Sequence, residues 1–235
     1  YLIQVLLKEM PAYQEQARAF PQDELSQRRL LRSLMNVRPP MPLDPSFLAV
    51  QDALLSAERE EKGGGEADAL QDRPGHPGIA VWQGDITRLK ADAIVNAANE
   101  ALLGCFIPCH SCIDNIIHAV AGPALRAECA RYMTWAETFD PTRRQGGEPA
   151  GRAVFTGGYH LPAQHVIHSV GPVIEDGRKP TMHDRRLLSS CYTSVPNVAH
   201  AAGLGYVGPC ALFTGLFGSP NRPAATVDME HSGRR

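Results

Sequence analysis

The pattern of the chain changes at Gly63-Gly64-Gly65, and this change constrains the fold more than any other feature of the sequence. Residues 1–61, before the glycines, carry apolar side chains at helical spacing among many charges. After residue 78, short apolar segments alternate with longer segments of helical periodicity. This alternation is typical of an α/β domain, in which helices cover a sheet. We therefore expect an N-terminal helical extension at residues 1–62, a flexible joint at 63–78 and an α/β domain after it.

Two signals divide the helical extension. Pro39-Pro40-Met41-Pro42 must interrupt any helix, because proline lacks the backbone N–H and restricts the residue before it. Asp44-Pro45-Ser46 then provides a helix start. The periodicity accordingly predicts helices over residues 14–20, 23–37 and 47–61.

The α/β part contains five short apolar segments that we expect to be strands. They are residues 79–83, 93–97, 153–156, 165–170 and 208–213. Helices are expected over residues 113–132 and 185–202, the second interrupted or kinked at Pro196. The pattern predicts a three-layer α/β fold with a sheet flanked by helices. Ligands in such folds lie beyond the carboxyl ends of the strands, so the loops at 84–87, 96–99 and 213–218 should converge at one edge.

Composition and charge exclude several classes of partner. The 235 residues carry a formal net charge of −2, so no basic footprint for nucleic acid is present. No apolar run is long enough to span a bilayer. The apolar N-terminus at residues 1–8 is short and lacks a small-residue cleavage site, so it does not resemble a signal peptide. Six cysteines, several of them clustered, favour metal or catalytic use in a reducing compartment, and we expect a cytoplasmic protein.

Cys105, His110 and Cys112 form the most telling cluster. Thiolate and imidazole are ligands that zinc prefers, and three ligands leave a tetrahedral ion one open position, as in catalytic zinc sites. The C-x4-H-x-C spacing alone is a weak signal, since common zinc patterns pair C-x2-C with a second pair. Cysteine also often serves as a small buried hydrophobe. Residue types therefore leave both a metal site and a structural cluster open.

Neighbouring residues add alternatives to this ligand set. Cys109, beside His110, is a rival thiol that either competes as a ligand or points away. His118, His165 and His168 are close in sequence, but a histidine in a helix or strand is more often a satisfied structural residue. We therefore leave these three histidines out of the candidate site.

An ordered set of motifs resembles the macrodomain family, whose α/β fold binds ADP-ribose. The closest resemblance is to the zinc-dependent macrodomains of microbes, which act as ADP-ribosylhydrolases. The similarity covers residues 25–218, including the N-terminal helical stretch at 31–38. The motifs are Gly84-Asp85-Ile86-Thr87, Asn96-Ala97-Ala98-Asn99 within 91–99, Leu103-Gly104-Cys105-Phe106-Ile107-Pro108, His110-Ser111-Cys112-Ile113-Asp114-Asn115, Ile117-His118, Ala121-Gly122, and the stretches 157–163 and 166–172.

The resemblance implies roles for individual residues. Asp85 and the Ile86 backbone would bind adenine, which suits a carboxylate that accepts from an exocyclic amino group. Asn96 and Asn99 would position the distal ribose, and Asp114 would act as a base or as a partner of a metal ligand. Taken alone, Asp85 and the asparagines equally suit turn or capping roles, and Asp114 suits the start of a helix. The resemblance also assigns zinc to Cys105, His110 and Cys112, and diphosphate binding to Thr214, Gly215, Leu216 and Phe217.

The implied function is zinc-dependent removal of ADP-ribose from modified protein side chains. Cleavage at C1″ of the distal ribose passes through a transition state with oxocarbenium character. The ion would orient and polarise the substrate, or, as the second choice, acidify the attacking water. The alternatives are a module that binds ADP-ribose without cleaving it and an inactive remnant with a structural zinc. An ADP-ribosylated protein is the expected partner, and the resemblance suggests a functional link to a sirtuin-type ADP-ribosyltransferase.

The C-terminal part departs from the family pattern. Pro196 and Pro209 fall where a helix and a strand are expected, and Phe213 and Ser219 replace residues that the family usually has. We expect a macrodomain core at residues 79–218 and an irregular tail at 219–235 in which the closing strand and helix are missing. The sequence thus predicts an apparently truncated C-terminus, with a sheet edge left uncovered.

Overall fold

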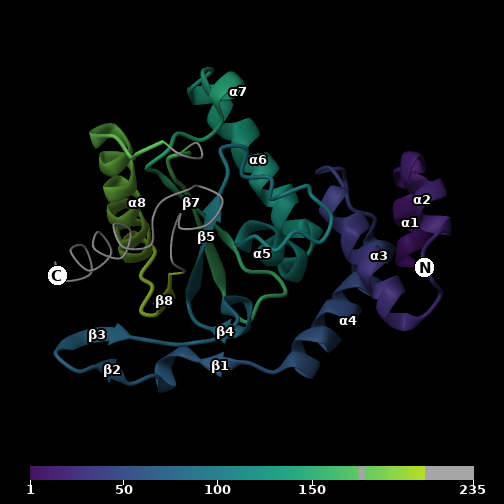
Figure 1. Cartoon of the computed structure of the whole chain (residues 1–235), viewed down its shortest axis with the longest axis horizontal. Helices are drawn as coiled ribbons and strands as arrows, with labels where there is room; N and C mark the ends of the chain where they lie inside the picture. The colour runs from purple at the N-terminus through teal and green to yellow at the C-terminus, as the bar shows by residue number, and fades with distance from the viewer. Residues whose placement is uncertain (175–177, 210–235) are drawn as a thin grey trace.

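A four-stranded sheet lies at the centre of the computed structural model, which describes residues 1–174 and 178–209 (Figure 1). Its strand order is β6-β7-β5-β8. The strands are β5 (Ala93–Ala98), β6 (Ala153–Gly157), β7 (His165–Val170) and β8 (Val207–Gly208). β5 runs parallel to β7 and β8, whereas β6 is antiparallel to β7. Every residue of β5 is buried, as expected of an apolar run at the centre of a parallel arrangement.

Helices cover both faces of this sheet. Ala93, Val95 and Ala97 of β5 pack on α8 (Met182–Ala201). The alternate residues of the strand, such as Ile94, face α5 (Ile113–Ala121) and α6 (Pro123–Phe139), which α7 (Arg143–Gly146) follows. The predicted three-layer mixed sheet flanked by helices is confirmed, as are the strands expected at 93–97, 153–156 and 165–170.

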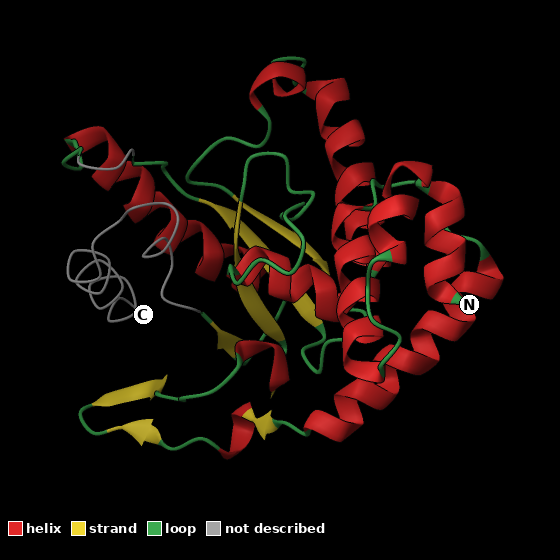
Figure 2. Ribbon diagram, turned by 45° about the vertical axis from the view of Figure 1, so that its right-hand side comes forward, coloured by secondary structure: helices red, strands yellow, loops and turns green. Residues whose placement is uncertain are grey.

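The N-terminal helices form a further unit with its own apolar core. They are α1 (Leu2–Glu9), the 3₁₀ turn η1 (Pro11–Tyr13), α2 (Gln14–Arg18), α3 (Glu24–Val37) and α4 (Pro45–Lys62). Asp23 and Asp44 cap α3 and α4 by accepting backbone N–H groups of the first turn. Figure 2 shows these helices gathered on one side of the sheet, and α3 contacts α5 there. The helices predicted over residues 14–20, 23–37 and 47–61 are present.

The segment between α4 and β5 contains only short elements. These are β1 (Gly65–Glu66), η2 (Ala67–Ala69), β2 (Asp72–Arg73), β3 (His76–Ala80), η3 (Ile86–Arg88) and β4 (Leu89–Lys90). β1 pairs with β4, and β2 pairs with β3 in a hairpin outside the central sheet. The strand predicted at residues 79–83 is therefore wrong in position, since only residues 79 and 80 belong to a strand, β3, which lies outside the central sheet. Its side chains are largely exposed, so the segment lacks the burial that would have fixed it in the sheet.

Two predicted helices also differ from the structure. The helix expected over 113–132 is two helices, α5 and α6, separated at Gly122, whose φ of 87° ends the first. The interruption expected at Pro196 is absent, because α8 continues from Met182 to Ala201 through this residue. Pro196 lies on the exposed side of α8.

Parts of two predictions lie outside the described residues. Of the final strand expected at 208–213, the structure describes β8 at Val207–Gly208. The expected phosphate-binding residues Thr214, Gly215, Leu216 and Phe217, and the tail at 219–235, are beyond the described part. Within residues 1–174 and 178–209, no helix has both the length and the apolar character needed to cross a bilayer.

Candidate functional site

Asn96 lies inside β5, because this strand continues to Ala98 and takes in the first three residues of the Asn-Ala-Ala-Asn motif. Its side chain is fully buried on the face of the sheet that α5 covers. Asn99 follows the strand and shapes the next turn, since its Oδ1 accepts the N–H of Ala101 at 3.0 Å and its Nδ2 donates to the Gly104 carbonyl at 3.2 Å. The two asparagines thus stand at the carboxyl end of the central strand, where α/β folds place ligands.

Asp114, in the first turn of α5, joins the two asparagines. Its Oδ1 accepts from Asn96 Nδ2 at 2.8 Å and its Oδ2 accepts from Asn99 Nδ2 at 3.3 Å. Burial raises the pKa of this carboxyl to about 6, while the hydrogen bond from Asn96 and the charge of Arg126 act in the opposite direction. The structure therefore brings together the three residues that the sequence proposed as catalytic.

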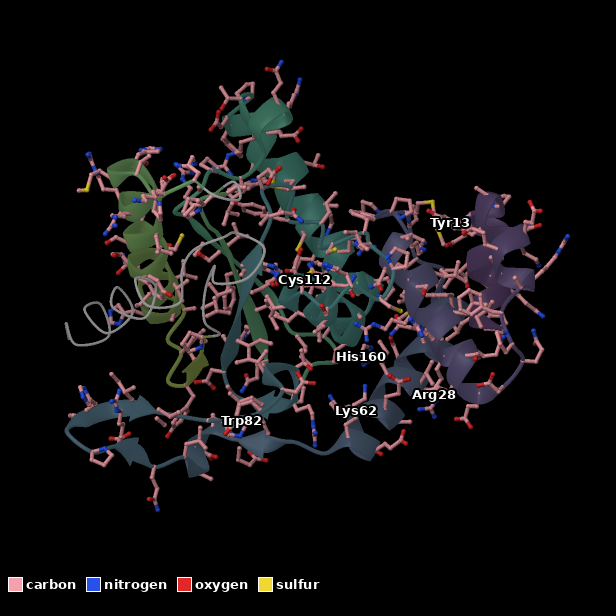
Figure 3. All side chains as sticks on the ribbon, viewed as in Figure 1. Tyr13, Arg28, Lys62, Trp82, Cys112 and His160 are labelled. Carbon is pink, nitrogen blue, oxygen red and sulfur yellow. The ribbon has the colours of Figure 1, made fainter. Side chains whose placement is uncertain are left out.

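The candidate metal ligands also converge. The ligand atoms of Cys105, His110 and Cys112 all lie within 4.8 Å of one another, and all three side chains are half-buried. Cys105 Sγ is 3.7 Å from His110 Nδ1. Figure 3 shows Cys112 between β5 and the N-terminal helices, where its thiol caps α5 by accepting the Asn115 N–H. Two thiols and an imidazole that meet at an accessible point fit zinc with one position left open.

Burial raises the pKa of the Cys112 thiol to about 11, and the neighbouring Cys105 and Asp114 add to that rise. The rival thiol of Cys109 points elsewhere. Cys109 has a left-handed φ of 51°, and its Sγ lies 3.3 Å from Ser33 Oγ on α3. Among the described residues, Cys109 thus falls outside the group of converging ligand atoms.

The loop at residues 103–112 carries these ligands without regular secondary structure, and buried polar side chains hold it from three sides. Arg126 on α6 donates Nε to the Leu103 carbonyl at 2.6 Å, and its guanidinium lies 4.4 Å from the centre of the Phe106 ring. Asn115 on α5 donates to the carbonyls of Cys105 and Ile107, and Asn36 on α3 accepts the N–H of Cys109. Protein contacts from α3, α5 and α6 therefore hold the loop.

Arg126 also ties this loop to the N-terminal helices. Its Nη1 donates to the carbonyls of Met35 and Arg38 at the end of α3. Gly104 permits the tight course of the loop, since it has a φ of 79° and a Cβ there would lie 2.7 Å from the His118 ring. A helix of the N-terminal unit is thus part of the environment of the candidate metal site.

The expected adenine-binding residues lie at the start of η3. Asp85 is exposed, and its Oδ1 accepts from Thr87 N at 3.0 Å and from Thr87 Oγ1 at 2.7 Å, so this carboxylate caps the turn. Ile86 is half-buried and packs on the core shared with α5. Both hydrogen bonds use Oδ1, and an ionised carboxylate has a second oxygen that accepts, so capping and ligand binding are compatible.

A cavity of about 290 Å³ opens at the same carboxyl edge of the sheet, on the side of α7 and α8. Its lining includes Glu100, Glu148 and the end of β7 at Val170 and Gly171. Within the described residues, none of the side chains predicted for the site lines it. The side chains predicted as catalytic instead meet one another around Asn96 and Asp114.

His168 is the residue of this region that sequence reasoning excluded. It is fully buried on β7, and its Nδ1 lies 3.1 Å from Asn96 Nδ2. His118 on α5 and Cys129 on α6 lie near it, with ligand atoms of all three within 4.8 Å of one another. The signal that would have found His168 is the pairing of β5 with β7, which periodicity within a single strand does not contain.

The fold and the site define an α/β domain with paired asparagines at the end of its central strand, next to a loop of candidate metal ligands. The chain belongs to the Macro domain family, whose model matches residues 95–227. It is 42% identical over 233 residues to a protein-ADP-ribose hydrolase of Treponema medium, covering 97% of this chain and 83% of that relative. A protein-ADP-ribose hydrolase of Staphylococcus aureus strain MSSA476 is 44% identical over 202 residues, or 84% of this chain and 70% of the relative.

Solved structures show the same fold. A Trypanosoma brucei macrodomain crystallised in complex with ADP-ribose superimposes with a TM-score of 0.59 at 29% identity, covering 86% of this chain and 82% of the other. An Oceanobacillus iheyensis macrodomain with ADP gives a TM-score of 0.52 at 29% identity over 63% of this chain and 70% of the other. The macrodomain architecture expected from the sequence is thereby confirmed.

Proposed function

We propose that this chain is a protein-ADP-ribose hydrolase that uses zinc to remove ADP-ribose from modified protein side chains. The observation that carries the proposal is the joining of Asn96 and Asn99 by Asp114, within two residues of the candidate ligand Cys112. The relatives named protein-ADP-ribose hydrolase support the reaction class, because they are 42–44% identical over most of the chain.

In this proposal the asparagines hold the distal ribose. Amide groups donate to and accept from sugar hydroxyls, and fixed orientation of a substrate lowers a barrier by several kcal/mol, up to about 7–11 in well-oriented cases. The transition state gains oxocarbenium character at C1″, so precise placement of the ring matters more than a strong nucleophile. Asp114 acts through the two amides, because each of its oxygens already accepts one of them.

Cys105, His110 and Cys112 would hold the zinc ion in the proposal. When bound, zinc supplies Lewis-acid polarisation of a ribose hydroxyl or of a water molecule. Asp85 and Ile86 are proposed for adenine, and Thr214, Gly215, Leu216 and Phe217 for the diphosphate, on the strength of the family resemblance. An ADP-ribosylated protein is the proposed substrate, and a sirtuin-type transferase the proposed source of the modification. The five free cysteines among the described residues support a reducing compartment, and we propose the cytoplasm.

The decisive experiment compares C105S with C109S, two thiol changes on one loop. Zinc content is measured by atomic absorption, and release of ADP-ribose from a modified protein is measured in the same preparations. We expect C105S to lose both zinc and activity, because its ligand atom belongs to the converging group, and C109S to keep both. Full zinc and full activity in C105S would refute the zinc proposal, and loss of zinc in C109S would reassign the ligand set.

The second candidate is an ADP-ribose-binding module without hydrolysis. The engagement of both Asp114 oxygens favours it, because a general base must have its oxygen directed at the proton it removes. Calorimetric binding of ADP-ribose by a zinc-loaded protein that releases no ADP-ribose from any modified side chain would establish this alternative.

A further inference from the structure

Asn96 and His168 are direct partners in the sheet. β5 and β7 are parallel, and the register pairs Asn96 with His168, so both side chains extend from the same face of adjacent strands. That face is covered by α5 and α6, and both side chains are fully buried. The separation of 3.1 Å between Asn96 Nδ2 and His168 Nδ1 is that of a hydrogen bond.

The direction of this hydrogen bond follows from the chemistry of its two ends. Asn96 Nδ2 is a donor only, and one of its two hydrogens goes to Asp114 Oδ1 at 2.8 Å. The other hydrogen meets His168, whose Nδ1 must then accept and carry no proton. In a neutral ring the proton therefore sits on Nε2, which lies 2.9 Å from Thr156 Oγ1 on β6. Burial, which lowers the pKa of His168 to about 4, keeps the ring neutral at pH 7.

The two acceptors around Asn96 Nδ2 determine which way the amide points. A flipped amide would direct its oxygen at the Asp114 carboxylate, where two acceptors repel. In the orientation present, Asn96 Oδ1 is buried and has no hydrogen-bond partner among the described residues. A buried carbonyl oxygen without a partner costs about 1–3 kcal/mol, so the fold retains an acceptor that a bound ligand would satisfy.

From this arrangement we infer that His168 is a positioning residue, which accepts from Asn96 through Nδ1 and thereby presents Asn96 Oδ1 as a hydrogen-bond acceptor to a ligand hydroxyl. The inference rests on the proposed function and deepens it, since it identifies a ligand hydroxyl as the hydrogen-bond donor that Asn96 Oδ1 recognises. The buried contacts run from Thr156 through His168 and Asn96 to Asp114 and Asn99, across β6, β7, β5 and α5. His168 lies between Thr156 and Asn96 in this series.

The nearby His118 and Cys129 do not give His168 a competing role as a metal ligand. Both ring nitrogens of His168 already have partners, Asn96 and Thr156. Cys129 is buried, and its Sγ lies 3.8 Å from His168 Nε2, farther than Thr156 Oγ1 at 2.9 Å. A hydrogen-bonded role therefore fits His168 better than a role as a metal ligand.

The test uses a matched pair of variants, H168N and H168Q. An asparagine oxygen takes the place of Nδ1 and still accepts from Asn96, whereas a glutamine amide takes the place of Nε2 and reaches only Thr156. Both variants keep a neutral amide in the core, and urea unfolding checks that their stabilities are alike. ADP-ribose binding is measured by calorimetry, and hydrolysis of a modified protein gives kcat and KM.

We expect H168N to bind ADP-ribose nearly as well as the wild type, and H168Q to bind about tenfold more weakly, as for the loss of one well-placed hydrogen bond. Equal binding by H168Q and the wild type, or equal losses in both variants, would overturn the inference.

The ring of His168 gives a readout independent of function, because ¹⁵N NMR of the ligand-free protein should show Nε2 protonated and Nδ1 without a proton. The opposite tautomer refutes the positioning role even if ADP-ribose binds, whereas a wild type that neither binds nor cleaves refutes the proposed function alone.

Discussion

The carboxyl end of β5 and the loop at residues 103–112 are neighbours, but they are held in different ways. Asn96 belongs to a strand, and the hydrogen-bonded ladder with β7 fixes the position of its backbone. The loop has no ladder, and Arg126, Asn115 and Asn36 hold its backbone groups from α6, α5 and α3. A few polar side chains therefore determine the shape of the candidate metal site, whereas the strand register determines the neighbouring asparagine site.

The largest effect should come from Arg126. R126M leaves the carbonyls of Leu103, Met35 and Arg38 without their donor, and each buried unsatisfied acceptor costs about 1–3 kcal/mol. We expect the free energy of unfolding to fall by about 4 kcal/mol, measured with urea, and zinc affinity to fall with it. The matched change R131M, at an exposed position of the same helix, should cost less than about 0.5 kcal/mol. Equal stabilities of the two variants would show that the loop is held by something else.

The burial of His168, the β7 partner of Asn96, is tested by the pH dependence of stability. His168 has a pKa lowered by burial from 6.5 to about 4, so between these values the unfolded chain binds more protons than the folded one. The contribution of His168 to the free energy of unfolding is therefore present above pH 6.5 and is lost as pH falls to 4, by about 3 kcal/mol. Asp114, whose pKa is raised by burial, acts in the opposite direction.

Because Asp114 titrates in both proteins, the measured quantity is the difference in unfolding free energy between the wild type and H168Q. This difference should shrink by about 3 kcal/mol on going from pH 7 to pH 4. Parallel pH profiles for the two proteins would show that the His168 ring is not held neutral in the folded state.

Asp114 connects the two regions, and D114N tests that connection. The new amide places a donor against Asn96 or Asn99, where both neighbours also donate, so at least one asparagine must turn. We expect hydrolysis to fall about a hundredfold through misplacement of the ribose, while zinc content stays unchanged. Turnover and zinc are measured in one preparation, and an unchanged rate would contradict the anchoring role.

The smallest effect is expected at the N-terminal contact of the loop. N36A removes the buried acceptor for the Cys109 N–H and should lower the free energy of unfolding by about 1–2 kcal/mol. Competition with a chromophoric chelator should show zinc binding weakened about tenfold, as when an outer partner of a metal site is lost. S33A loses the contact with the Cys109 thiol and an exposed hydrogen bond to the Arg29 carbonyl within α3, and it should change neither quantity appreciably. Unaltered zinc affinity in N36A would separate the N-terminal helices from the metal site.

The sequence predicted the fold where local signals were strong. The apolar runs at 93–97 and 165–170 became β5 and β7, and Asp44 caps α4, as the helix start signal at Asp44-Pro45-Ser46 predicted. The strand at 79–83 was wrong because an apolar run forms a sheet strand only when other elements bury it. The helix at 185–202 passes through Pro196, since packing of the apolar face on the sheet outweighs one lost hydrogen bond.

The candidate site was likewise predicted in part from the sequence and in part only from the structure. The residue types of Cys105, His110 and Cys112 were sufficient to propose a soft metal site, but four candidate ligands on one loop could not be ranked from spacing. The structure brings the three together and turns Cys109 towards α3. His168 was left out of the candidate site because the sequence around a strand histidine does not indicate which residue of the neighbouring strand it will contact.

The sequence by itself determined the order of helices and strands, the helix caps and the chemical character of the candidate ligands. These depend on side chains within a few positions of one another, where periodicity and backbone hydrogen bonding act directly. Only the tertiary structure decided that Asn96 meets His168, 72 positions away, and that α3 holds a loop more than 70 residues further along. Those contacts depend on strand register and on helix packing, which are settled by burial of the whole core rather than by any local segment.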